Sequence, residues 1–298
     1  MLRRPGPALL LATLAAALLA LTGLFARVVP LSEQGHAGPL PDLPRLTGLL
    51  DHIAHSADPG PYALTGLLLA LIALVRGRWR TALAIPALFV LTGATTEHLK
   101  HLVASPRVDE WLGAHAQISA ASWPSGHSTA AMTMALCAVL AVPPRLRPTV
   151  AVLGGGYALA VAYAILTLGW HWPSDVFGGY LVASTYVLVA IAGLAWADLR
   201  WPSRRGAEAG ARPADVVPAV VVALLAACAA AGLAFARPHA LLGYAQTHTT
   251  FVAGALAIAG LAAVIAAVMV VGFAAGGGSS SSWPPAATTA PRRRSPRG

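Results

Sequence analysis

The stretch Ala121–Met132, ASWPSGHSTAAM, places proline, serine, glycine and histidine directly before an apolar segment. Proline sets the entry of the chain and serine is a favourable N-cap residue, so a helix is predicted to begin at Ser125. The surrounding run, Ile118–Pro144, contains no lysine, arginine, aspartate or glutamate. Since about 20 apolar residues cross a bilayer, the run predicts a membrane helix with a polar first turn.

The composition of the whole chain agrees with a membrane protein. The 298 residues are 57% hydrophobic and only 10% charged, whereas a soluble domain carries about a quarter charged residues. We therefore predict an all-α integral membrane protein, with a six-helix transmembrane core and two extra C-terminal transmembrane helices. The predicted spans lie within Ala8–Ala26, Pro59–Val75, Thr81–Thr96, Ile118–Pro144, Thr149–Trp170, Val176–Ala197, Val216–Ala236 and Thr249–Ala275.

The same pattern predicts the domain organisation. Residues 1–197 form the core, 198–215 an inner linker, 216–275 the two added spans and 276–298 a disordered basic tail. Within an outer segment, residues 46–57 are predicted to form an interfacial helix. The first span is either a retained helix or a signal peptide, and its length favours the retained helix, because a signal h-region has about 7–15 residues.

The basic residues indicate the orientation. With the N-terminus inside, most of the 20 lysine and arginine residues fall in inner segments, which is the positive-inside pattern. The net charge of +9 is therefore interpreted as a topology signal and not as nucleic-acid binding. Both termini are predicted to be cytoplasmic in a multi-pass plasma-membrane protein, and the Ala- and Arg-rich composition is typical of a GC-rich bacterial genome.

This topology brings polar residues from distant parts of the chain to the outer ends of the third to sixth spans. Two histidines, one acid, two cations and a Ser-Gly pair are expected to share that face of the membrane. The residues are Lys100, Arg107, Ser125, Gly126, His127, His171 and Asp175.

Each of these residues has both a structural and a chemical interpretation. Lys100, the only lysine, either extends to the interface and pairs with Glu97 or binds a phosphate as a point charge. Arg107 is either a solvated loop cation or a second phosphate ligand. Ser125 and Gly126 either only begin a helix or form an anion site with its free N–H groups. His127 is either an interfacial side chain or a proton donor.

The sequence HWPSD places His171 four residues before Asp175. Asp175 could simply complement the dipole of the following helix, and His171 could belong to an aromatic belt beside Trp170 and Trp172. Alternatively, Asp175 accepts a hydrogen bond from one ring nitrogen of His171, which leaves the other nitrogen free as a nucleophile. We favour the chemical interpretation, because the structural one requires the cations, the helix start, the histidines and the acid to share one membrane face by chance.

The order Lys-x6-Arg, Pro-Ser-Gly-His and His-x3-Asp, with PSGHSTAAM and GWHWPSDVFGGYL, resembles the type 2 phosphatidic acid phosphatase family, over about residues 67–197. That family includes undecaprenyl pyrophosphate phosphatases and shares its site with vanadium haloperoxidases. The resemblance implies a metal-independent phosphatase without a cofactor, acting on a lipid phosphate monoester or diphosphate in the bilayer. It implies that His171 attacks phosphorus, Asp175 orients it and His127 protonates the leaving group. It also implies that the phosphoryl oxygens are held by Lys100, Arg107, Ser125 and Gly126.

The chain departs from the family pattern in two places. Arg107 is followed by Val108 instead of proline, and the Ser-Arg pair that opens the third motif is replaced by Ala164 and Ile165. Thr167 or His101 could partly substitute for the missing cation. The alternative function is therefore a catalytically weakened or inactive relative that binds lipid phosphate head groups.

A metal site or transporter is a third hypothesis. Several histidines lie in outer segments, and two pairs have i,i+3 spacing, but such pairs are weak signals without cysteine or a set of carboxylates. The spans also lack the mid-membrane charges that mark an ion path. The sequence leaves the oligomeric state open. The histidines concerned are His52, His55, His98, His101 and His115.

Overall fold

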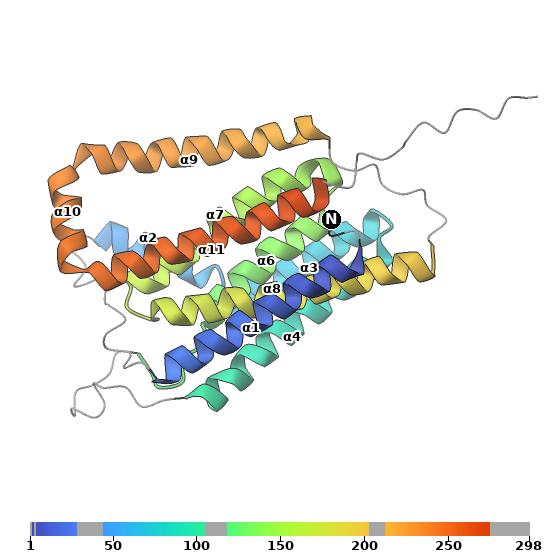
Figure 1. The fold of residues 1–298 in the computed structure, drawn as a ribbon, viewed down its shortest axis with the longest axis horizontal. Coiled ribbons are helices and arrows are strands. Elements are labelled where there is room, and N and C mark those ends of the chain that lie inside the picture. The colour runs from blue at the N-terminus through green and yellow to red at the C-terminus, as the bar shows by residue number, and fades with distance from the viewer. Residues whose placement is uncertain (1, 3, 29–43, 105–117, 203–211, 275–298) are drawn as a thin grey trace, which may run out of the picture.

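The computed structural model describes residues 2, 4–28, 44–104, 118–202 and 212–274, and in these residues it contains helices and no strand (Figure 1). The predicted all-α membrane class is therefore confirmed. The helices are α1 (Pro5–Val28), α2 (Pro44–His55), α3 (Pro59–Val75), α4 (Trp79–Val103), α6 (Gly126–Ala141), α7 (Arg147–Thr167), α8 (Pro173–Arg200), α9 (Val217–Ala236), α10 (Pro238–Thr247) and α11 (Thr249–Ala274), with short 3-10 turns at Pro144–Leu146 and Pro213–Val216.

Each predicted span contains a helix, but not every helix is long enough to cross a membrane. Within the described residues, six helices pass on length and composition, and α2 with α3, bent by 51°, would make a seventh span. Helix α6 has only 16 residues, which is about 24 Å at 1.5 Å per residue. The predicted run was longer because residues 118–125 before the helix are uncharged yet irregular, and Pro143 and Pro144 follow its end.

Contacts between distant helices define two ends of the bundle. At the first, called here the motif end, the last part of α1 meets Trp123 just before α6, since a Cβ added at Gly23 would lie 2.8 Å from its ring. At the opposite end the Leu2 N–H donates to the Gly272 carbonyl at 3.0 Å. Arg80 at the start of α4 pairs there with Asp198 near the end of α8, at 2.7 Å. Helices α1 and α4 therefore run toward the motif end, and α6, α8 and α11 run away from it.

Helix α6 lies at the centre of the bundle and is almost wholly buried, in contact with α3, α4, α7 and α8. Small residues permit this close packing: a Cβ added at Gly154 of α7 would lie 2.9 Å from the Ala135 side chain. Buried hydroxyls also link α6 to α4. Thr96 donates to Thr129 at 3.1 Å, and Thr133 donates to Thr92 at 3.3 Å.

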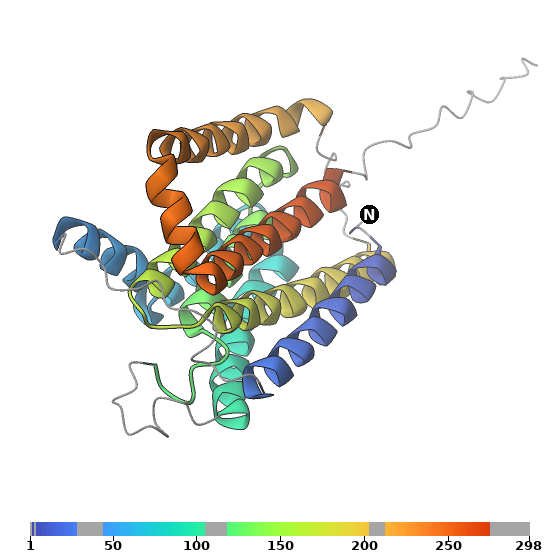
Figure 2. The ribbon, with the colours of Figure 1, turned by 60° about the vertical axis from the view of Figure 1, so that its left-hand side comes forward.

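The C-terminal helices do not form a separate unit. Helix α11 packs against α7 and α8 and contributes Ile258 and Met269 to the main hydrophobic core. Helix α9 lies outside the bundle, along α7, and α10 connects it to α11 (Figures 1 and 2). Of the two C-terminal spans, α11 therefore belongs to the main core, whereas α9 lies outside it.

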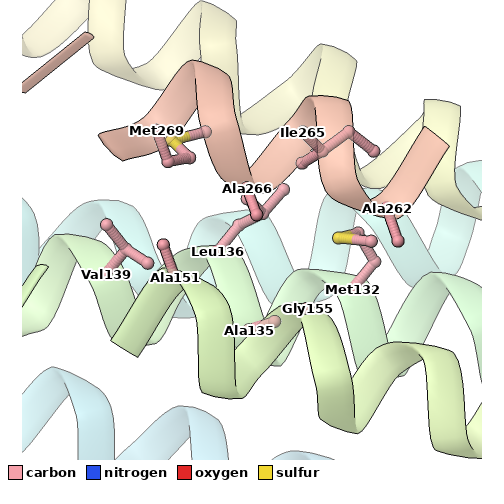
Figure 3. A pocket seen from close by; sticks show the side chains of 10 residues that line it. All are labelled: Met132, Ala135, Leu136, Val139, Ala151, Gly155, Ala262, Ile265, Ala266 and Met269. Atoms are coloured by element: carbon pink, nitrogen blue, oxygen red, sulfur yellow. The ribbon is translucent and has the colours of Figure 1, made fainter. Parts of the chain in front are cut away.

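A small apolar cavity lies where α6, α7 and α11 meet (Figure 3). Its walls include Met132 and Leu136 of α6, Gly155 of α7 and Met269 of α11. No polar side chain lines it, so the cavity is not suited to holding an ordered water molecule. It is a packing gap between three helices and lies apart from the polar residues at the motif end.

Candidate active site

Helix α6 begins with an N-cap that also joins two helices. The Ser125 Oγ accepts the Ser128 N–H at 3.3 Å, and the Ser125 N–H donates to the Asp175 carbonyl at 2.8 Å. The hydroxyl of Ser125 is fully buried and can still donate its own hydrogen. The N–H groups of Gly126 and His127 have no hydrogen-bond acceptor within the described part of the chain. This first turn thus offers donors to an anion.

Helix α8 begins around a buried carboxylate. Asp175 is 0% exposed, and its Oδ2 accepts the Trp172 N–H at 3.0 Å. The same oxygen lies 3.3 Å from the His171 Nδ1, so the pair predicted from the i,i+4 spacing is formed. With Nδ1–H donated to Asp175, the Nε2 of His171 carries the free lone pair. Oδ1 of Asp175 has no partner among the described residues.

Two adjacent glycines of α8 allow these helix starts to meet. A Cβ at Gly179 would lie 2.8 Å from the Ser125 carbonyl oxygen and 2.8 Å from the Thr129 nitrogen. A Cβ at Gly178 would lie 2.6 Å from the Trp123 Nε1. Real Cβ atoms essentially never approach so closely, so the backbones of α6 and α8 can cross here only at glycine.

His127 extends from the first turn of α6 toward both His171 and the start of α3. Its ring centroid lies 6.3 Å from that of His171 and 5.5 Å from that of Trp170. Its Nε2 lies 3.1 Å from the Asp58 Oδ1, a contact that the sequence did not predict. The two histidines are thus close enough to act on opposite sides of one bound group.

Lys100 reaches the same place from the last turn of α4. A Cβ built at Gly126 would lie 3.5 Å from the Lys100 Nζ, so the ammonium group is next to the start of α6. The Nζ also pairs with Glu97 at 2.6 Å, as the structural interpretation of Lys100 predicted. Both interpretations of this residue are therefore compatible with its position.

The remaining residues to place are Arg107, Thr167 and His101, together with Ile165 at the position of the family's arginine. Arg107 lies outside the described residues, as does His115. Thr167, the last residue of α7, is half-buried and His101 is exposed, and neither makes a hydrogen bond to the site within the described ranges. Ile165 is 0% exposed and belongs to the main hydrophobic core. The position of the family's missing cation is thus filled by apolar packing.

Sequence reasoning missed Asp58 and did not assign His55 to this place. The His55 ring lies edge-on to Trp170, with centroids 5.4 Å apart. The available signal was topological, since the span beginning at Pro59 also starts on the predicted outer face. In the described ranges no group of three or more His, Cys, Asp or Glu residues has the arrangement of a metal site, and the i,i+3 histidine pairs form no such group.

These features define a class of protein: a multi-pass all-α membrane protein whose helix ends carry a His–Asp pair, a second histidine and a lysine. Residues 81–201 match the family model of the PAP2 superfamily. This segment is therefore similar to the PAP2 superfamily, in agreement with the resemblance to type 2 phosphatidic acid phosphatases. The match runs from α4 through α8 and includes both histidine motifs. No match was found among curated proteins or among solved structures.

Proposed function

We propose that this protein is a membrane phosphatase that hydrolyses a lipid phosphate or a polyprenyl phosphate or diphosphate through a phosphohistidine on His171. The observation that carries the proposal is the His171–Asp175 pair, placed beside His127 and Lys100 by three helix ends. The PAP2 superfamily match supports the phosphatase class.

In the first step, the Nε2 of His171 attacks phosphorus while the bond from phosphorus to the leaving oxygen breaks. Asp175 holds Nδ1–H, which directs the Nε2 lone pair outward and stabilises the positive charge that develops on the ring. His127 gives a proton to the leaving oxygen. In the second step, water attacks the phosphohistidine, and His127 takes up the proton that the water loses.

The negative charge of the transferring group is matched by donors at the start of α6. Lys100 supplies a positive charge, and the N–H groups of Gly126 and His127 point from the first turn. Ser125 can donate its hydroxyl hydrogen, because its Oγ only accepts from Ser128. The resemblance adds Arg107. Phosphoryl transfer depends mainly on such positioning and charge stabilisation.

The substrate class follows from the surroundings of the site. The site lies at the ends of apolar helices, so a phosphate attached to a hydrocarbon tail could bind with its head at the motif end and its tail along the bundle. The positive-inside distribution supports an outer-face location for this end, with both termini cytoplasmic in the plasma membrane.

The test is phosphate release by the purified protein in detergent from phosphatidate, polyprenyl phosphates and diphosphates, and a glycolipid phosphate. His171→Ala should abolish turnover and the acid-labile phosphoenzyme seen after rapid quenching. His239→Ala is the matched control, because that histidine is exposed on α10, far along the chain. Full activity of His171→Ala would exclude this nucleophile.

The burial of Ile165 favours a second candidate, a relative that binds lipid phosphate without hydrolysing it. Removing one charge-assisted donor from such a site costs roughly 10²–10³ in rate. The wild-type protein would then bind lipid phosphate in an equilibrium assay yet form no phosphoenzyme. Measurable turnover that depends on His171 would exclude this candidate.

A further inference from the structure

Asp58 stands at the N-cap of α3, directly before Pro59 at the first helical position. Aspartate is a favoured N-cap residue because its carboxylate usually accepts an N–H of the first turn. Here the side chain makes no such capping bond. Its Oδ1 instead lies 3.1 Å from the Nε2 of His127, which is 69 positions further along the chain. The carboxylate therefore does not cap α3 and instead contacts a side chain of α6.

The segment before Asp58 is anchored to the bundle. The Ser56 hydroxyl lies 3.0 Å from that of Tyr157 on α7, and Tyr157 also donates to the Ser56 carbonyl at 3.4 Å. Ala54 and Ala57 are buried. Because the α2 side of the bend is held against α7, the position of Asp58 relative to α6 is not set by the His127 contact alone.

We propose that Asp58 is a positioning residue for His127. The site then contains two carboxylate–histidine pairs, one that transfers the phosphoryl group and one that transfers the proton. This inference rests on the proposed function. Asp175 orients His171 as nucleophile, and Asp58 orients His127 as proton donor. Asp58 lies outside the segment that matches the PAP2 superfamily, so this part of the site comes from the N-terminal helices.

The contact also decides which nitrogen of His127 does the chemistry. With Nε2–H donated to Asp58, Nδ1–H faces the remaining space. As the Nε2 of His171 bonds to phosphorus, the electron pair of the breaking P–O bond goes to the leaving oxygen, which takes the proton from Nδ1. When water then attacks phosphorus, Nδ1 accepts its proton and the P–N electron pair returns to His171. Nε2–H stays on Asp58 throughout.

The charged groups around His127 have opposite effects on the protonation of its ring. His171 lies 6.3 Å away, ring to ring, and His55 on α2 acts on His127 electrostatically, so both disfavour a second positive ring when they are protonated. Lys100, next to Gly126, has the same effect and is partly neutralised by Glu97. Buried Asp175 is paired with His171. Among the described residues, Asp58 is the carboxylate in contact with His127, and it favours the protonated ring.

The experiment compares Asp58→Asn with Asp51→Asn in full-length protein. Asp51 is a matched control: its carboxylate lies on α2, near the same bend, and pairs with His55 at 3.4 Å instead of His127. Two substrates are used, an alkyl lipid phosphate, whose leaving oxygen needs a proton, and p-nitrophenyl phosphate, whose leaving group needs none. Asp58→Asn should lower kcat/KM, which reports the step in which the leaving group departs, by about 10- to 100-fold on the alkyl substrate and by less than about 3-fold on the aryl substrate.

The pH profile is the second readout. Loss of the carboxylate should move the alkaline limb of kcat on the alkyl substrate about one unit toward lower pH, since an adjacent opposite charge favours the charged ring. Asp51→Asn should keep the wild-type profile. A purely structural defect would lower both substrates equally and leave the limb in place, which would overturn the proposal.

A double-mutant cycle is the third readout. If Asp58 acts through His127, then Asp58→Asn should cause no further loss on the alkyl substrate in a His127→Ala background. Full additivity would overturn the positioning role. Different results would exclude the proposed function itself: no phosphate release by the wild-type protein, or full activity of His171→Ala.

Discussion

At the scale of single residues, the candidate site depends on a few buried polar atoms with assigned partners. Asp175 accepts hydrogen bonds from both the Trp172 N–H and the His171 ring, and its carbonyl accepts the Ser125 N–H. One residue therefore positions the nucleophile and ties the start of α8 to the start of α6.

Replacing this acid should reveal its role. Asp175→Asn keeps the shape of the side chain but can donate to Nδ1, which would present the wrong tautomer of His171. We expect kcat to fall by about 10²–10⁴-fold with little change in KM, measured by phosphate release. Asp198→Asn, at the opposite end and mostly exposed, should remain close to wild type. Near-normal kcat for Asp175→Asn would contradict the proposed nucleophile.

At the scale of elements, the site exists because α6 and α8 cross at a glycine pair. The first turn of α6 lies so close to Gly179 that a methyl group there cannot be accommodated without moving backbone, and Gly178 lies against the side chains of Trp123 and Pro124 just before α6. In a membrane, where lipid is as apolar as the protein interior, such close packing is a main source of helix association. The crossing therefore contributes both to stability and to the placement of Ser125 beside Asp175.

Gly179→Ala should separate these two helix starts. The added Cβ would lie 2.8 Å from the backbone of Ser125 and Thr129, so α8 must shift. We expect a loss of about 1–3 kcal/mol in stability, measured as a lower melting temperature in detergent, together with reduced kcat. Gly193→Ala, on the same helix with nothing within 4 Å, should be neutral or slightly stabilising. Equal behaviour of the two variants would show that the crossing is not tight.

At the scale of the whole molecule, the C-terminal helices support the site. The start of α11 lies against the start of α8, where a Cβ added at Gly254 would be 2.8 Å from the ring of Pro173. Pro173 begins the helix turn that holds Asp175. Thus α11, which lies beyond the segment matching the PAP2 superfamily, braces one of the histidine motifs from outside.

Gly254→Ala should therefore disturb catalysis from a distance. The methyl group would press on the rigid proline ring, tilt the first turn of α8 and misplace His171. A small misplacement of a reacting group can cost up to about 10²-fold in rate, and we expect roughly a tenfold fall in kcat. Gly260→Ala, further along α11 with no neighbour within 4 Å, is the matched control. An unchanged kcat in Gly254→Ala would show that α11 does not support the site.

The sequence by itself determined much of this protein. The helices, the all-α membrane class and the i,i+4 contact of His171 with Asp175 could be predicted, because apolar run length, proline positions and helical spacing are local properties. The distribution of charges predicted which helix ends share a face, and Lys100 does lie beside Gly126. The PAP2 superfamily match confirms the family resemblance on which the roles of these residues depend.

Only the tertiary structure decided which side chains meet across helices. The Asp58–His127 contact, the short length of α6, the burial of Ile165 and the place of α11 in the core were not predictable. The physical reason is that a membrane helix can be apolar on every face, since lipid and protein interior are alike in polarity. Its rotation and crossing are then set by the packing of small residues and by isolated polar contacts, and neither leaves a periodic signal in the sequence.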